Sequence, residues 1–160
     1  MRQQHGLTLV ELLVTLAVLA ILVGVAFPGF QGLLERNNLA TTSNALVLAI
    51  NLARSEAVRT SGVMNLEAVD ASTATNEWGP GWRVTPPGGP VVRVFEPIPG
   101  GLTLNSDEAS TTVQLGSRGG LLGVPDYEFE LCTAAQGGVR IRIAATGRVA
   151  TTDLAPGDCP

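Results

Sequence analysis

The chain has 160 residues, a formal net charge of −4 at pH 7 and a charged fraction of 15%. This length allows one small domain plus an extended segment, and the negative charge argues against a protein built mainly as a polycation for nucleic acid. All ten basic residues are arginine, and the single histidine, His5, lies near the start of the chain. Most metal sites and most acid–base catalysis near neutral pH are therefore disfavoured, and we expect no metal, no cofactor and no enzymatic activity.

A long apolar run extends from Leu7 to Phe27 and contains a single charged residue, Glu11. As a helix this run would be about 30 Å long, which is enough to cross the hydrocarbon core of a bilayer. We therefore expect residues 7–27 to span a membrane. Arg2 precedes the run, which predicts a cytoplasmic N-terminus and an extracytoplasmic remainder.

Glu11 is the unusual residue of this run. A carboxylate inside hydrocarbon costs about 3 kcal/mol on insertion scales, so a simple anchor would carry an apolar residue in its place. A carboxylate that is kept at this depth suggests a function that supplies it with a partner.

The segment Gly6-Leu7-Thr8-Leu9-Val10-Glu11-Leu12-Leu13 resembles the processing motif of type IV prepilins and type II secretion pseudopilins. The resemblance implies a leader at residues 1–6, cleavage by prepilin peptidase between Gly6 and Leu7, and methylation of the new amino group. It also implies a partner for Glu11, namely the free α-amino group of a neighbouring subunit in a filament. A paired buried carboxylate can set the register between subunits. Leu7 departs from the phenylalanine with which mature chains of this family usually begin.

Three other interpretations of the N-terminal segment stay open at this point. A secretory signal peptide would use Arg2, a shorter apolar stretch and a small-residue cleavage site at Gly24-Val25-Ala26. A one-pass anchor explains the length of the run but neither Glu11 nor the glycine before Leu7. A buried core helix is disfavoured by the length and apolarity of the run.

A second helical pattern follows the apolar run. Pro28 and its neighbouring glycines predict a kink or local melting near residue 28, and the pattern resumes from about Leu33 to Thr60. Its apolar positions recur every three, four or seven residues, as expected for a stripe that packs on a sheet; they are Leu39, Leu46, Ile50, Ala53 and Ala57. We place the whole N-terminal helix at residues 7–61.

From residue 62 the apolar period changes to two. Short alternating runs separated by glycine and proline clusters, such as Pro86-Pro87-Gly88-Gly89-Pro90, predict about seven short strands. The fold class is therefore α+β, with a long N-terminal helix, half membrane-spanning and half amphipathic, packed on a C-terminal antiparallel β domain at residues 62–160.

The last hairpin allows a prediction of its register. In residues 127–131 and 139–143 apolar side chains alternate with charged ones, which are acidic in the first segment and basic in the second. Pairing Glu130 with Arg140 also places Glu128 opposite Arg142. The same register sets apolar residues opposite one another on the other face, so one arrangement satisfies both faces of the sheet.

Cys132 and Cys159 are the only two cysteines. In an extracytoplasmic domain they most simply form one structural disulfide. Such a bond would hold the last residues of the chain in place and would stabilise the fold by about 3 kcal/mol in the chain-entropy model.

Three further segments resemble the minor pilins and pseudopilins of the FimT and GspH type. They are the helix segment 45–58 with its core Ala53-Arg54-Ser55-Glu56-Ala57, the turn Trp78-Gly79-Pro80-Gly81-Trp82, and Gly147-Arg148-Val149. The resemblance covers the full length and implies a helical spine with an antiparallel β head. A purely structural interpretation also exists for each segment: a solvated helix face, core packing and an exposed turn.

The resemblance leaves three functions. The first is a minor pilin that assembles near the tip of a type IV pilus with other pilins, its head periplasmic and its helix in the bacterial inner membrane. The second is a pseudopilin of a type II secretion system. The third is DNA capture during uptake, through Arg148, Arg140 and Arg142 in contact with phosphates. Ala150 stands where the family's DNA-binding pattern has a further arginine, and Glu128 and Glu130 are expected beside the strand arginines, so we expect any DNA binding to be weak.

Overall fold

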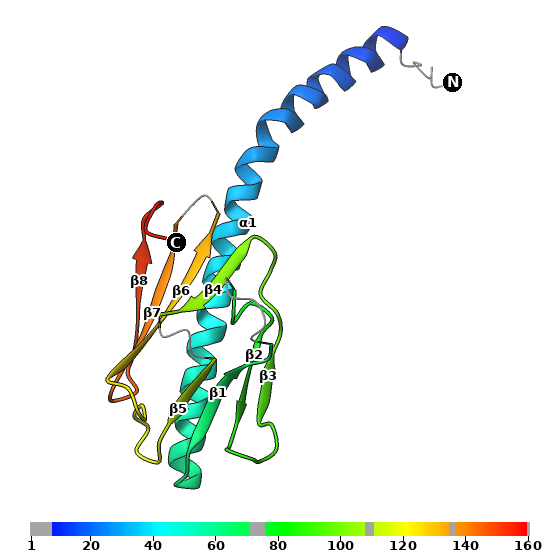
Figure 1. Cartoon of the computed structure of the whole chain (residues 1–160). Coiled ribbons are helices and arrows are strands. Elements are labelled where there is room, and N and C mark those ends of the chain that lie inside the picture. Colours follow the sequence, from blue (N-terminus) through cyan, green and yellow to red (C-terminus); the bar gives the residue numbers. More distant parts are fainter. Residues whose placement is uncertain (1–7, 71–75, 108–110, 135–136, 160) are drawn as a thin grey trace. The chain divides into compact units, whose positions relative to one another are not determined.

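The computed structural model describes residues 8–70, 76–107, 111–134 and 137–159. The chain divides into two units, Met1–Arg36 and Asn37–Pro160. One helix, α1 (Leu9–Thr60), contributes to both units, and all strands of the described residues belong to the second (Figure 1).

The described part of the first unit is the N-terminal portion of α1. The helix is continuous from Leu9 to Thr60, so the helical segments predicted on either side of Pro28 form one helix. The alternative of local melting near residue 28 is therefore wrong, and a kink there stays a prediction. Within the part of the chain that the structure describes, no helix combines the length and apolarity that a membrane crossing requires. The predicted span 7–27 includes Leu7, which lies outside the described residues.

The second unit begins with the amphipathic portion of α1, whose predicted apolar stripe is confirmed. The fully buried side chains of this portion are those of Leu46, Ala49, Ile50, Ala53 and Ala57, and Leu39 is partly buried against the same core. Since residues three and four apart lie on one helical face, this face is the one that carries the sheets. Because alanine side chains are small, the alanines of this face let the backbone of α1 lie close to the sheets.

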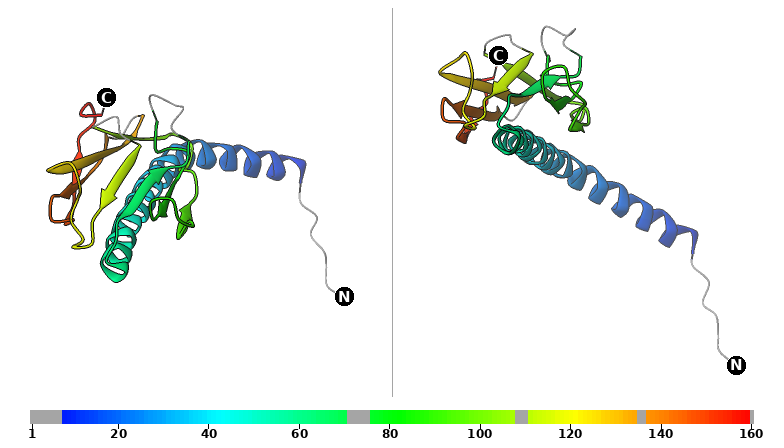
Figure 2. Two further views of the ribbon diagram at one scale, coloured as in Figure 1. Left: turned by 60° about the horizontal axis from the view of Figure 1, so that its bottom comes forward. Right: turned by 90° about the horizontal axis from the view of Figure 1, so that it is seen from below.

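Two antiparallel four-stranded sheets lie on one side of this portion of α1 (Figure 2). Sheet A has the strand order β3 (Arg93–Phe95), β2 (Trp82–Thr85), β1 (Met64–Ala68), β5 (Thr112–Leu115). Sheet B has the order β4 (Leu102–Ser106), β6 (Asp126–Thr133), β7 (Gly137–Ala144), β8 (Val149–Leu154). The predicted α+β class is confirmed.

The prediction of about seven strands was short by one, because the described residues contain eight. The missed strand is β8, the edge of sheet B, in which only Leu154 is buried. An exposed edge strand needs no apolar alternation, so β8 lacks the signal on which the prediction depended.

The register of the β6–β7 hairpin agrees with the sequence prediction at every predicted pair. Glu130 lies opposite Arg140 and Glu128 opposite Arg142. On the other face the three apolar pairs are Leu131 with Val139, Phe129 with Ile141 and Tyr127 with Ile143. The alternation of charge and apolarity therefore specifies this pairing, because a shift by one residue would bury the charges.

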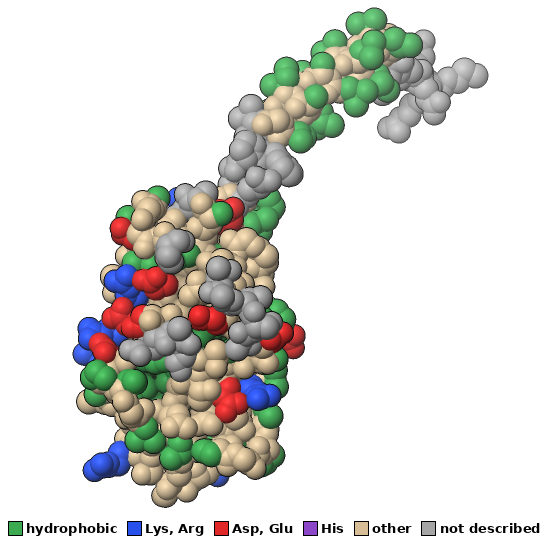
Figure 3. Space-filling view, viewed as in Figure 1, with side chains coloured by type: hydrophobic (Ala, Val, Ile, Leu, Met, Phe, Trp, Pro, Cys, Tyr) green, Lys and Arg blue, Asp and Glu red, His purple; other side chains and the backbone are tan. Residues whose placement is uncertain are grey.

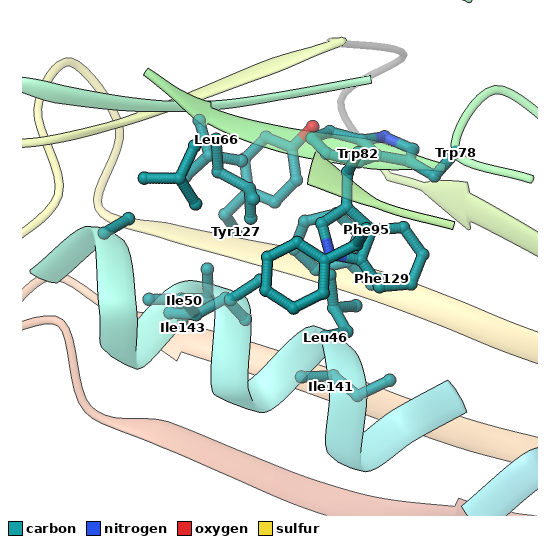
Figure 4. Close-up of a cluster of buried hydrophobic side chains, with 14 of the residues drawn as sticks. Leu46, Ile50, Leu66, Trp78, Trp82, Phe95, Tyr127, Phe129, Ile141 and Ile143 are labelled. Atoms are coloured by element: carbon teal, nitrogen blue, oxygen red, sulfur yellow. The ribbon is translucent and has the colours of Figure 1, made fainter. Parts of the chain in front are cut away.

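Aromatic side chains fill the space between α1 and the sheets (Figure 4). Trp78 and Trp82 are both buried. Trp78 meets the ring of Phe129 edge-on at 4.9 Å between centroids, and Trp82 stacks on Phe95 at 5.8 Å. The tryptophan-flanked turn is therefore part of the core, as in the structural interpretation of that segment.

Candidate functional site

Glu11, the predicted assembly residue, lies in the first turn of α1 and is exposed. Its backbone N–H donates a hydrogen bond to the hydroxyl oxygen of Thr8 at 3.2 Å, and the N–H of Leu12 donates to the carbonyl oxygen of Thr8. Thr8 is thus the N-cap of the helix, and an acid three residues later favours the helix N-terminus. The spacing of Thr8 and Glu11 is a capping signal in the sequence that the sequence analysis missed.

Gly6 and Leu7, the residues of the predicted cleavage site, lie outside the described residues. The cap at Thr8 places the start of the described helix directly after them. Cleavage and methylation at this site stay predictions.

The disulfide between Cys132 and Cys159 is present. The two Cα atoms lie 5.9 Å apart, within the range that a disulfide requires. Cys132 belongs to β6 and Cys159 follows β8, so the bond joins the end of the chain to the β6–β7 end of sheet B. No free cysteine remains.

Arg140 and Arg142 on β7 form a ladder of ion pairs with three acids on β6. Arg140 donates to Glu130 at 2.7 Å and lies 3.4 Å from Glu128. Arg142 donates to Asp126 and lies 3.3 Å from Glu128. Figure 3 shows acidic and basic side chains side by side over this part of the head. We call these five residues the acid–arginine ladder.

The ladder also affects the titration of its arginines. Hydrogen bonding to Glu130 raises the pKa of Arg140 above its ordinary value, and hydrogen bonding to Asp126 raises the pKa of Arg142. Both guanidinium groups are charged at every relevant pH, so the consequence is local charge balance. With three carboxylates against two guanidinium groups, the ladder presents no excess of positive charge.

Arg148, the third predicted DNA contact, lies in different surroundings. It is exposed directly before β8, and within the described ranges its side chain forms no ion pair or hydrogen bond. The structure therefore separates the three predicted arginines into two that are paired with acids and one that is not.

Gly147, which precedes Arg148, has a packing role. Its φ is 77°, and a Cβ atom at this position would overlap the carbonyl oxygen of Gly119 in the β5–β6 connection. A Cβ on Gly119 would in turn lie 2.9 Å from Nε of Arg54. Two loops and one helical arginine thus meet in a contact that only glycines allow. The segments around Arg54 and Gly147 were singled out in the sequence, but nothing local in it indicated that they touch.

The part of the chain that the structure describes contains no candidate metal site, because no three side chains of His, Cys, Asp or Glu there lie close enough together to hold a metal ion. Three pockets lie in this part, and the one between residues 116–122 and 145–146 is lined by loops alone.

Comparison with known families gives two matches. Residues 42–147 match the family described as type II transport protein GspH. Residues 1–27 match the prokaryotic N-terminal methylation motif. The first match covers α1 from Thr42 onward and the strands up to Gly147, and the second covers the predicted leader and apolar run.

Comparison with solved structures shows that the fold of this chain resembles that of a known protein. Two crystal structures of the type IV minor pilin FimU from Pseudomonas aeruginosa are 24% and 22% identical in sequence to this chain, with TM-scores of 0.67 and 0.64. They cover 79% and 76% of this chain, and the match includes 98% and 100% of their own chains. No curated protein sequence matches significantly.

Proposed function

Since the chain belongs to the GspH family of type II transport proteins, we propose that it is a structural filament subunit, a minor pilin that assembles near the tip of a type IV pilus. The observation that carries the proposal is the combination of an N-terminal methylation motif with an extended helix and a β head. The similarity in fold to a type IV minor pilin supports the pilus. The proposal assigns no catalytic role to the chain.

The proposed maturation follows the order of the sequence. Residues 1–6 are a leader, prepilin peptidase cleaves between Gly6 and Leu7, and the new amino group of Leu7 is methylated. The match of residues 1–27 to the methylation motif supports these steps. Residues 7–61 then form the helix, and residues 62–160 form the head.

Before assembly, the mature chain is held in the bacterial inner membrane through residues 7–27, with the N-terminus cytoplasmic and the head periplasmic. The described part of this segment exposes large apolar side chains in an isolated chain, among them Leu9 at 76%, Ile21 at 67% and Leu13 at 56%. Such a surface needs a cover, either lipid or the helices of other pilins. The same apolar surface of the helix is therefore covered first by lipid, in the membrane, and then by other pilin helices, in the filament.

Glu11 is proposed to pair with the methylated α-amino group of a neighbouring subunit. Its position in the first turn of α1 and its exposure support this role. An exposed carboxylate among exposed apolar side chains becomes costly once the helix is buried, unless a cation accompanies it.

The experiment is Glu11→Ala in the full-length chain, with Glu35→Ala as the matched control on the same helix. We expect Glu11→Ala to reduce the amount of the protein in sheared filaments severalfold, and Glu35→Ala to leave it unchanged. The cap at Thr8 survives both substitutions, because it uses the backbone N–H of residue 11. Equal incorporation of the two variants would exclude the pairing role of Glu11.

A pseudopilin of a type II secretion system is the alternative within the same family. The family description itself, type II transport protein, supports it. Genes for other minor pilins next to this one would favour the pilus, whereas genes for secretion components would favour the pseudopilin.

DNA capture is a second candidate function, favoured by the exposure of Arg148 without an acidic partner among the described residues. Arg140 and Arg142 support it less, because the acid–arginine ladder engages both. An arginine of this kind contacts phosphates and positions the nucleic acid without reading its sequence.

A further inference from the structure

A pocket of about 390 Å³ lies between the β5–β6 connection and the turn that joins β7 to β8. Both segments are at the lower left of the head in Figure 1. The first segment contributes Ser117, Arg118, Leu121 and Leu122 to the wall of the pocket, and the second contributes Ala145 and Thr146. We call this site the two-loop pocket.

Specific contacts hold the two loops together. The backbone N–H of Leu121 donates to the carbonyl oxygen of Ala145 at 2.9 Å. Beside this bond, Gly147 lies against Gly119, and a Cβ on either residue would come within 3.4 Å of the Arg54 side chain. The pocket is therefore a defined part of the packed head and not the accidental space beside a single loop.

The charged residues of the two loops that form the pocket are all arginine. Arg118 and Arg148 are exposed, and Arg54 is half-buried beneath Gly119. Neither residues 116–125 nor residues 143–152 include an acid. In the described part of the chain, the side chains of Arg118 and Arg148 form no ion pair.

The polar groups of the pocket suit a phosphate. Ser117 and Thr146, both exposed residues with hydroxyl groups, line the pocket from opposite loops, and Arg118 lines it as well. Hydroxyl and guanidinium donors are the groups with which proteins hold phosphate oxygens. Leu121 and Leu122 add an apolar wall, which suits the sugar of a nucleotide unit.

We propose that the two-loop pocket binds a phosphate group of a nucleic-acid backbone, with Arg118, Ser117 and Thr146 as its contacts and Arg54 as a positioning residue beneath Gly119. The proposal rests on DNA capture as the candidate function. In this proposal the main contacts to DNA are made by the two loops, and not by Arg140 and Arg142 of β7. Arg148 follows Thr146 by two residues and takes a neighbouring phosphate.

The test uses full-length protein in neutral detergent and a fluorescein-labelled 30-base-pair duplex, with anisotropy measured across a series of NaCl concentrations. Arg118→Gln should weaken binding about tenfold at low salt and lower the slope of log K against log salt by about one. The matched control is Arg93→Gln, which removes the same charge from an exposed position on sheet A. Circular dichroism of each variant verifies that the fold is intact.

A second variant separates hydrogen bonding from charge. Ser117→Ala/Thr146→Ala should weaken binding severalfold while the salt slope stays the same, since no cation is lost. A general effect of positive charge would leave this double variant at wild-type affinity, and that result would overturn the pocket as the site.

A final arm replaces the duplex with pyrophosphate, measured by isothermal titration calorimetry. Pyrophosphate binding that depends on Arg118, without duplex binding, would assign the pocket to free phosphates and reject DNA capture. Duplex binding that Arg118→Gln and Arg93→Gln weaken equally would keep DNA capture and reject the pocket. If the wild-type protein bound neither the duplex nor pyrophosphate, the proposal would be overturned.

Discussion

The arginines of the acid–arginine ladder and those of the two-loop pocket lie on neighbouring parts of the same head, yet their surroundings differ. Arg140 and Arg142 point from β7 toward carboxylates of β6 at hydrogen-bonding distance. Arg118 and Arg148 lie on loops whose sequences contain no acid. Arginine side chains thus form ion pairs between two strands in the acid–arginine ladder, whereas the arginines of the two loops form none among the described residues and can contact a ligand.

The difference shows that neighbouring acids, and not the motif in which an arginine stands, determine whether its guanidinium group is paired. Exposed ion pairs contribute only about 0.2–1 kcal/mol each to stability, so the ladder mainly fixes register and balances charge. An unpaired arginine carries no such constraint, and its charge acts on whatever approaches. Separate changes to each region can test this contrast.

The largest expected effect concerns the disulfide, which lies at the end of sheet B away from the two-loop pocket. Cys159→Ser should lower the free energy of unfolding by about 3 kcal/mol, because the unfolded chain gains conformational freedom. Urea denaturation measures this loss. Duplex binding should be unchanged, and a parallel loss of binding would show that the two ends of the sheet are not independent.

The next effect concerns the contact between the two loops. Gly147→Ala should cost about 2–3 kcal/mol, because the new Cβ overlaps the carbonyl oxygen of Gly119 and the packed loops must shift. Gly123→Ala is the control, since Gly123 also has a positive φ, 85°, but has open space around it. It should cost about 1 kcal/mol, the penalty of left-handed backbone alone. Equal losses in thermal denaturation would contradict the loop contact.

The smallest effect converts paired arginines into unpaired ones. Asp126→Asn/Glu128→Gln removes both acids that contact Arg142. We expect duplex binding to strengthen severalfold and its salt slope to rise by about one, since one more arginine can meet a phosphate. The control Glu96→Gln/Asp153→Asn makes the same change of net charge at exposed positions. An identical gain in the control would mean that net charge, and not pairing, sets the affinity.

The sequence predicts the parts of this molecule that have a local period. The helical stripe through Leu46 and Ile50 and the register of Glu130 with Arg140 follow from spacings of three, four and two residues. Each pattern marks the face of a helix or strand that is buried, and the burial of that face is what stabilises the element in the fold. The disulfide followed from the count of cysteines and their expected compartment.

Features without a local period had to come from the structure. β8 is an exposed edge, and its sequence resembles that of a loop. The meeting of Arg54, Gly119 and Gly147 joins three distant segments, and no spacing encodes such a contact. Asp126 is a different case, because it hydrogen-bonds Arg142 although Glu128 lies directly opposite; long side chains reach diagonal neighbours on a sheet.

Processing by prepilin peptidase would leave a defined first residue, so the N-terminus of the mature chain is the decisive test of the proposed filament subunit. We would extract the protein from membranes of cells with an active prepilin peptidase and determine its first residue by mass spectrometry. We expect a chain that begins with N-methylated Leu7. A chain that retains residues 1–6, or that begins after Ala26 as it would after removal of a secretory signal peptide, would exclude a processed pilin.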